Sequence, residues 1–411
     1  MPFNGSGLFT RVYNWTVDAG SAIPITASRV DTEDNGFATG LSNCICKDGQ
    51  TTITANLPMN GFTHTGVGNA TATNQYASYG QLLNSITPGG FTNKIRNNSF
   101  LVSSRGTSGT ITAGSPAYTL DGWMLFAGSA NITWSQSGTL GYPALKSLSI
   151  TGNTGVTNTQ LYQRIESIVA GYIDGQQVTF QASITNNTGA TITPTLIVSH
   201  ANASDNWGAT TTDLSVSLQS IANGATAKVA YTYTAASNSY FGLQFILDFG
   251  AILNSVAKSV SVSNVDVRVT PGITTGLNNS PSPVEIIDIT AEKLRCARYL
   301  PAFASTGTDS PIPSIGITSA TATINNILIP FPVPTRVAVT GVTVSAASHL
   351  NTTDSVVYSL AVSAVVIGTS LSNTQALIAV TQSGVGTTIG RGATLKFNNA
   401  SGLMIFTGAE L

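Results

Sequence analysis

The feature that most constrains the fold is a period-two alternation of apolar and polar residues in short runs. Residues 178–184 (VTFQASI) and 260–267 (VSVSNVDV) show it most clearly. Such alternation places one face of a strand against a core and the other in water. Turn-forming residues such as 186–189 (NNTG) separate the runs. Roughly eight such runs without long helices predict a mainly β fold, a β-sandwich of the jelly-roll type.

The predicted strands of this sandwich are residues 132–134, 148–150, 178–184, 195–199, 214–218, 227–233, 240–247 and 259–269. Pro- and Gly-rich breakers at residues 87–90 and 270–283 bound the region. We therefore predict an N-terminal segment with a connector (1–86), a jelly roll (87–282), and a linker helix with a smaller C-terminal β-domain (283–411).

Two stretches have helical spacing. In the N-terminal segment, Val30, Phe37, Leu41 and Cys44 fall on one face of a short helix. A helix this short does not bury its apolar stripe alone, so it needs a partner, either copies of itself in a trimer or a neighbouring protein. The second helical stretch is residues 289–300.

Composition excludes several classes of protein. Charged residues make up 9% of the 411 residues, against about 25% in an ordinary soluble domain. The net charge is −1 and no basic run occurs, which predicts no nucleic-acid partner. No apolar run is long enough for a spanning helix, which predicts no membrane insertion. The first residues do not resemble a signal peptide.

The sequence predicts neither a cofactor nor a metal. It has three cysteines, Cys44, Cys46 and Cys296, and an odd number argues against a disulfide framework. We expect all three to be reduced and buried. The histidines are scattered without ligand spacing.

A glycan-cleaving enzyme needs paired carboxylates. The candidates are Asp121, Glu166, Asp205, Asp213, Asp248 and Asp266. Each also has a structural interpretation: Asp121 lies in a turn, Asp266 points outward from a strand, and Asp248 pairs with a base such as Lys258. No nucleophile motif is present. We therefore predict no catalytic residues and a protein that is not an enzyme.

One polar and aromatic loop, residues 200–208, is a candidate carbohydrate-binding site. Trp207 would stack on a sugar ring while Asp205 and Asn206 bind its hydroxyls. The alternative is an exposed hairpin loop with Trp207 folded back on the sandwich. Trp123 and Trp134 lie in or beside strand runs and are predicted to be core residues.

The first seventy residues contain five short motifs in a characteristic order. They are residues 1–7 (MPFNGSG), 11–15 (RVYNW), 29–38 (RVDTEDNGFA), 41–50 (LSNCICKDGQ) and 66–70 (GVGNA). In this order they resemble the virion-attachment end of tailed-bacteriophage tail fibre proteins.

The middle of the chain is similar to a carbohydrate-binding-type jelly roll of phage fibres. The matching elements are residues 97–100 (NNSF) with 105–107 (RGT), 118–123 (YTLDGW), 163–166 (QRIE), 175–180 (GQQVTF) and 292–299 (EKLRCARY). The last resembles a closing "E-L-x-x-C-Q-R-Y" helix, with Ala297 in place of Gln.

The resemblance implies a bacteriophage tail fibre, a homotrimeric structural protein of the virion. It would attach to phage tail or portal-proximal proteins through residues 1–86 and bind bacterial surface polysaccharide during host adsorption. The alternatives are a tailspike-like glycan depolymerase and a capsid or head-fibre decoration protein.

Overall fold

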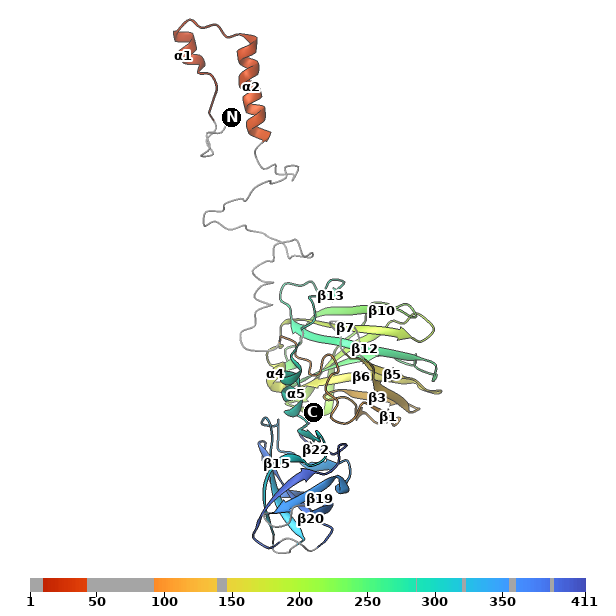
Figure 1. Cartoon of the computed structure of the whole chain (residues 1–411). Coiled ribbons are helices and arrows are strands. Elements are labelled where there is room, and N and C mark those ends of the chain that lie inside the picture. Colours follow the sequence, from red (N-terminus) through yellow and green to blue (C-terminus); the bar gives the residue numbers. More distant parts are fainter. Residues whose placement is uncertain are drawn as a thin grey trace. The chain divides into compact units, whose positions relative to one another are not determined.

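A computed structural model describes residues 10–42, 92–138, 146–285, 287–319, 323–354, 360–384 and 388–411 (Figure 1). The chain divides into two compact units, residues 1–68 and 69–411. Each unit is described by itself below.

The first unit contains two helices, α1 (Trp15–Gly20) and α2 (Ala27–Ser42), which confirms the predicted N-terminal helix. Val30 is 39% exposed and Leu41 is 70% exposed, so α2 leaves its apolar stripe largely open within this unit. Cys44, the last residue of the predicted stripe, lies outside the described residues.

Glu33 fixes the chain before α1 against α2. This side chain is 6% exposed, and its Oε2 accepts hydrogen bonds from Val12 N at 2.9 Å and Tyr13 N at 3.0 Å. A carboxylate that accepts backbone N–H groups is stabilised by charge-assisted bonds. The extended segment and the helix therefore form one hairpin-like piece.

The second unit begins with a sandwich of two antiparallel sheets, which confirms the mainly β prediction. In the described residues the sheets have the strand orders β1-β4-β5-β12-β7-β10-β13 and β2-β3-β6-β11-β8-β9. The strands are β1 (Ser108–Ile111), β2 (Ala117–Tyr118), β3 (Met124–Gly128), β4 (Ile132–Gln136), β5 (Leu148–Thr151), β6 (Asn158–Ile165), β7 (Gln177–Asn187), β8 (Thr195–Ala203), β9 (Asn206–Ser217), β10 (Thr226–Thr234), β11 (Leu243–Asp248), β12 (Ser259–Val269) and β13 (Gly276–Leu277). Two short helices, α4 (Ser167–Ala170) and η1 (Ser239–Phe241), and the longer α5 (Ile289–Ala297) accompany the sandwich.

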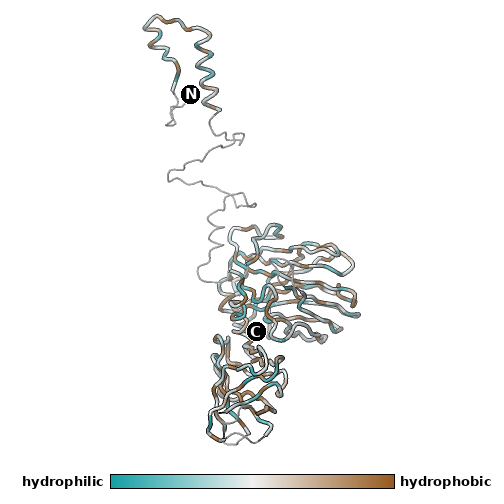
Figure 2. Tube along the Cα trace, viewed as in Figure 1, coloured by the Kyte–Doolittle hydropathy of each residue, from teal (hydrophilic) through white to brown (hydrophobic). Residues whose placement is uncertain are grey.

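The inner faces of the two sheets form one apolar core. Phe180 of β7 and Phe245 of β11 stack with ring centroids 6.1 Å apart, which joins the sheets at their centre. Trp123 and Trp134 are 2% and 6% exposed, and both belong to this core as predicted. Hydrophobic and hydrophilic residues alternate along the strands (Figure 2). Burial of each large apolar side chain contributes about 1.5–3 kcal/mol.

The structure differs from the prediction at several strands. The predicted strand at 240–247 begins instead at Leu243, because residues 239–241 form the turn η1 and Gly242 has φ +121°. Strands β3 and β6 were not predicted. In β6 (NTQLYQRI), polar residues such as Gln163 are buried on the core side, which hides the alternation.

After α5 the described chain forms a closed barrel with the order β15-β16-β20-β19-β18-β21 and a three-stranded sheet β14-β22-β17, while the predicted domain boundary at 282/283 stays a prediction. These strands are β14 (Ala302–Ala304), β15 (Ser310–Thr318), β16 (Ile324–Pro330), β17 (Gly341–Val344), β18 (Leu350–Asp354), β19 (Leu360–Leu371), β20 (Gln375–Gln382), β21 (Gly392–Phe397) and β22 (Leu403–Thr407). The buried residues of this part of the chain, including Ile378, Phe397 and Phe406, form a core separate from that of the sandwich.

We predict that Gly152→Ala destabilises the sandwich by about 1–3 kcal/mol, because overpacking forces the backbone to move. A Cβ at residue 152 would lie 2.0 Å from the carbonyl oxygen of Leu253. Thermal unfolding followed by circular dichroism measures the effect. Gly138→Ala is the matched control, since a Cβ there meets nothing within 4 Å. Equal unfolding midpoints for the two variants would contradict the prediction.

Candidate functional site

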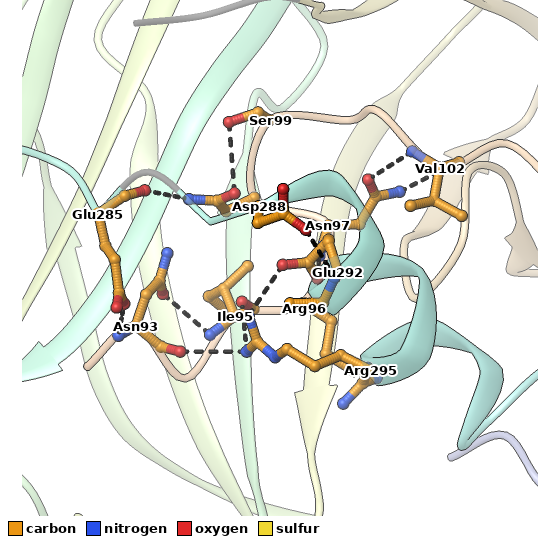
Figure 3. Close-up of polar contacts among 12 residues, drawn as sticks. Asn93, Ile95, Arg96, Asn97, Ser99, Val102, Glu285, Asp288, Glu292 and Arg295 are labelled. Carbon is orange, nitrogen blue, oxygen red and sulfur yellow. Dashed lines mark hydrogen bonds and ion pairs between the residues drawn. The ribbon is translucent and has the colours of Figure 1, made fainter. Parts of the chain in front are cut away.

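Two of the jelly-roll motifs, residues 97–100 and 292–299, meet beside α5 (Figure 3). Asp288 begins this helix as its N-cap, and its Oδ1 accepts hydrogen bonds from Thr290 N at 2.8 Å and Ala291 N at 3.2 Å. These bonds to the charged form lower the pKa of Asp288. The helix predicted at 289–300 is thus confirmed over Ile289–Ala297.

Asn93 and Glu285 attach the chain before β1 to β12. Asn93 Nδ2 donates to Val265 O at 2.9 Å, and its Oδ1 accepts from Ile95 N and Val267 N, each at 3.0 Å. Glu285 Oε2 in turn accepts from Asn93 N at 2.5 Å. Asn93 is completely buried, so these bonds satisfy polar groups that water does not reach.

Glu292 and Arg295 attach α5 to the same segment. Glu292 Oε1 accepts from Asn97 N, and its Oε2 accepts from Arg295 Nη1 at 2.9 Å. Arg295 Nη2 then donates to Asn93 O at 3.1 Å and Ile95 O at 3.0 Å. The Glu292 and Arg295 atoms described here bind each other and the backbone of residues 93–97. This gives the ion pair a structural role.

Asn97 closes the turn that carries the first motif of the jelly roll. Its side chain accepts from Val102 N at 2.9 Å and donates to Val102 O at 2.8 Å. The indole of Trp123 donates to Asn97 O at 3.0 Å. Asp121, in the turn before Trp123 as predicted, accepts from Ser104 N at 2.6 Å, and burial raises its pKa.

The motif at residues 163–166 divides its side chains between two faces of β6. Gln163 points inward, where it accepts from Arg96 N at 2.7 Å and donates to Arg96 O at 2.9 Å. Glu166 pairs with Arg298 through two bonds of 3.1 and 3.2 Å. Arg164 points to the opposite face, because neighbouring residues of a strand alternate.

That opposite face of the six-stranded sheet carries a second apolar cluster, apart from the core. We call it the outer-face cluster; its residues are Met124, Tyr162 and Ile246, with Tyr118, Phe126 and Ile197 packed against them. The strand register places Met124 beside Tyr162, Tyr162 beside Ile246 and Ile246 beside Ile197. One row of apolar side chains therefore crosses the strands β3, β6, β11 and β8.

Polar side chains border this row on both sides. On one side, Gln160 Nε2 donates to Asp248 Oδ2 at 2.8 Å. On the other, Arg164 Nε donates to Gln244 Oε1 at 2.9 Å. Both pairs join β6 to β11, so these side chains are held in fixed orientations. All four are half-buried and so retain contact with solvent.

Arg164 links the outer-face cluster to the predicted sugar loop. Its guanidinium lies 6.0 Å from the ring centroid of Tyr162 and 4.9 Å from that of Trp207. Burial lowers the pKa of Arg164, and the neighbouring Tyr162 opposes that effect. The stacking of a cation on the indole is worth about 0.5–2 kcal/mol.

The structure places the three predicted sugar-binding residues in different environments. Asp205 lies in the turn between β8 and β9 with φ +54°, and its carboxylate accepts from Ser167 N at 2.7 Å and Ser167 Oγ at 3.2 Å. Arg336 approaches it to 3.7 Å. Asn206 is exposed, and its Oδ1 accepts from Gly208 N at 3.1 Å.

Trp207 is half-buried and folds back on the sandwich. A Cβ at Gly242 would lie 3.0 Å from Trp207 Cζ2, so the absence of a side chain at residue 242 makes room for the indole. The indole Nε1 is buried without a hydrogen-bond partner in the described residues. The structure thus brings Trp207 to Arg164, whereas Asp205 is engaged with α4. Sugar binding by Asp205, Asn206 and Trp207 stays a prediction.

The structure corrects two structural interpretations of the acidic residues, that of Asp248 in full and that of Asp266 in part. Asp248 bonds to Gln160, while Lys258 Nζ donates to Asn254 Oδ1 at 2.9 Å. Asp266 is 0% exposed and forms an ion pair with Arg268. Val265 and Val267 on either side belong to the core, so Asp266 points to the other face of the sheet as predicted, but Glu285 N donates to its Oδ2 at 3.0 Å and this later segment covers it.

The remaining acidic candidate, Asp213, lies 2.7 Å from His200 Nδ1. Of the cysteines, Cys296 is free and buried, and burial raises its pKa; Cys44 and Cys46 fall outside the described ranges. Within the described ranges, no three His, Cys, Asp or Glu side chains gather as metal ligands would. Nor does any described helix have the length and hydropathy needed to cross a membrane.

No known protein family matches the sequence, and no curated protein matches it. Solved structures resemble it weakly. The C-terminal family 22 carbohydrate-binding module of Clostridium thermocellum Xyn10B matches with a TM-score of 0.30 and 11% identity, over 46% of this chain and 100% of that chain. The tailspike protein 4 domain of bacteriophage CBA120 matches with a TM-score of 0.28 and 13% identity, over 43% of this chain and 21% of that chain.

The N-terminal CBM22-GH10 modules of the same xylanase, complexed with xylohexaose, match with a TM-score of 0.30 and 12% identity. That match covers 44% of this chain, which spans 29% of the length of the xylanase modules. Similarities this weak do not establish a shared ligand or a shared activity.

We predict that Glu292→Ala destabilises the protein by about 3 kcal/mol, because removing one partner of a buried ion pair leaves the other charge unpaired. Its carboxylate is 3% exposed and also holds Asn97 N. Lys293→Ala, at an exposed position of the same helix, is the control. Thermal unfolding measures both variants. A loss no greater in the Glu292 variant than in the control would refute the structural role of the pair.

Proposed function

We propose that the outer face of the six-stranded sheet binds polysaccharide. The observation that carries this proposal is the outer-face cluster and its fixed polar border. The alternation of a sandwich strand normally leaves this face polar and wet. Here the half-buried Phe126, with Tyr162 and Ile246 at 6% and 8% exposed, forms an apolar strip on it.

The chemistry of the face suits a sugar chain. The C–H faces of sugar rings pack on aromatic rings, and sugar hydroxyls need planar donors and acceptors beside them. Gln160 with Asp248 and Arg164 with Gln244 supply such groups. Since each pair is already held by a cross-strand bond, little side-chain freedom is lost on binding.

We further propose that the chain is a receptor-binding tail fibre of a tailed bacteriophage. The support is the order of the N-terminal and jelly-roll motifs, together with the open stripe of α2 at Val30 and Leu41. Residues 1–86 would attach to phage tail or portal-proximal proteins, which places the protein in the virion. Several weak polysaccharide sites on one particle then act together, since linked sites raise the effective concentration.

A homotrimer is part of this proposal, and the barrel supports it. Ile315, Ile317 and Val366 on its outward face are 78%, 55% and 57% exposed. The register places Ile317 beside Asn326, Asn326 beside Ala379 and Ala379 beside Val366. These positions form a row on the outside of the barrel, and copies of the chain would bury it between them.

Binding without cleavage is the expected mode of action. The tailspike-like depolymerase and the head-fibre protein are the alternatives, and experiment separates them from the tail fibre. Shortened host polysaccharide by mass spectrometry after incubation would establish a depolymerase. Gold label on the capsid of intact particles would establish a head-fibre protein.

We predict that Arg164→Ala and Phe126→Ala each weaken binding to host surface polysaccharide about tenfold, because truncating a central contact typically costs about 1 kcal/mol or more. Affinity electrophoresis of the full chain in polysaccharide-containing gels measures this. Lys228→Ala, exposed on β10 of the other sheet, should bind as the natural protein does. Unchanged retardation of both outer-face variants would remove the proposed site.

We predict that Ile315→Asp combined with Ile317→Asp dissociates the trimer, since a charge buried at an apolar interface is strongly unfavourable. Light scattering after size-exclusion chromatography gives the mass. Ile389→Asp, at a 58% exposed position outside the strands, is the control and should stay trimeric. A monomeric natural protein, or a double variant that remains trimeric, would contradict the proposed interface.

A further inference from the structure

Arg96 is a buried cation without a counter-ion. Its residue is 6% exposed, and its Nε makes no hydrogen bond in the described part of the chain. No carboxylate among the described residues lies within ion-pair distance of its guanidinium. Buried charges in proteins are normally paired, and an unpaired one is costly. This arginine therefore requires an explanation beyond packing.

The contacts of Arg96 compensate its charge only in part. The guanidinium carbon lies 3.7 Å from the ring centroid of Tyr299. A cation over an aromatic ring gains about 2 kcal/mol when desolvated, which is less than the cost of burying an isolated charge. The two bonds to Gln163 engage only the backbone of Arg96. The side chain itself keeps its capacity to donate to an acceptor.

Arg96 lines a cavity of about 340 Å³. Ile165 and Val169 provide apolar wall, and Tyr172, which is 74% exposed, lies at the surface. Lys94 and Arg298 also line the cavity. The volume falls at the small end of ligand pockets and suits a single sugar residue.

The other charges around the cavity are engaged with one another. Arg298 pairs with Glu166, and Arg295 pairs with Glu292. Glu285 acts on Lys94 through its charge, and burial lowers the pKa of that lysine. After these pairings Arg96 is the cation lining this cavity that has no ion-pair partner among the described residues.

We propose that this cavity is a second binding site, which takes the carboxylate of an acidic sugar residue of the uronic acid type. The carboxylate would accept from the Arg96 guanidinium, whose planar donors match the two oxygens. The sugar ring would lie against Ile165, Val169 and Tyr172. The site is separate from the outer-face cluster, so it does not depend on the polysaccharide site proposed above.

The test is calorimetric titration of the full chain with D-glucuronate, with D-glucose as the neutral match and inorganic phosphate as the second oxyanion. We expect glucuronate to bind and glucose to leave no measurable heat. Arg96→Met keeps the length of the side chain on Tyr299 and removes the charge. This variant should bind glucuronate at least about tenfold more weakly, since a charge-assisted bond is lost.

A stability measurement separates a ligand site from a structural role. Without ligand, Arg96→Met should unfold at the same temperature as the natural protein or higher, because it removes an unpaired buried charge. Glucuronate should raise the unfolding midpoint of the natural protein and leave that of the variant unchanged. A variant that is destabilised and still binds glucuronate would overturn the assignment.

Three further outcomes decide the identity of the ligand and of the site. No heat with glucuronate in the natural protein, or binding of phosphate alone, would overturn the acidic-sugar site. Equal binding of glucose would do the same, since the charge would then play no part. Arg164→Ala should keep glucuronate binding while Arg96→Met keeps the retardation by a neutral polysaccharide, so the two proposed sites fail independently.

Discussion

The structure depends on a small set of buried acidic and amide groups that bind backbone atoms. Asn93, Glu285 and Glu292 accept hydrogen bonds from the segment before β1 and join it to β12 and α5. Each group would be costly to bury without these partners. The packing of the segment, the strand and the helix is therefore cooperative. The end of the sandwich is closed in this way, which positions β6 and its motif.

Strand β6 contributes side chains to both faces of the six-stranded sheet. Gln163 holds the backbone of Arg96 on the inner side, whereas Arg164 extends to Tyr162 and Trp207 on the outer side. Neighbouring residues of one motif thus lie on opposite faces, one packing inside the sandwich and the other at the proposed polysaccharide site. A motif match in a sequence does not tell which of its side chains face the core and which face outward. The alternation of the strand makes that distinction.

Much of the architecture follows from local pattern, and most of the surface chemistry does not. Alternation predicted β7, β8, β10 and β12 because their inner residues are apolar, and the helix near residue 292 followed from its spacing. The burial of Asp266 was not predicted, because the segment near Glu285 that covers it follows 19 residues later in the chain. The outer-face cluster was not predicted, since its members come from β3, β6, β8 and β11, and their register is a long-range property. The cavity at Arg96 was not predicted for the same reason, since its lining joins residues 93–96 to residues 295–299.

The barrel at the C-terminal end has a consequence for assemblies in which many copies lie close together. An open sheet presents unpaired N–H and C=O groups on its outermost strands, and these recruit strands of other molecules into fibres. In the barrel, β15 pairs with β16 on one side and with β21 on the other, so its ring of hydrogen bonds is complete. Where neighbouring copies meet at the barrel, they meet through side chains, so contacts made there favour defined oligomers over amyloid-like aggregation.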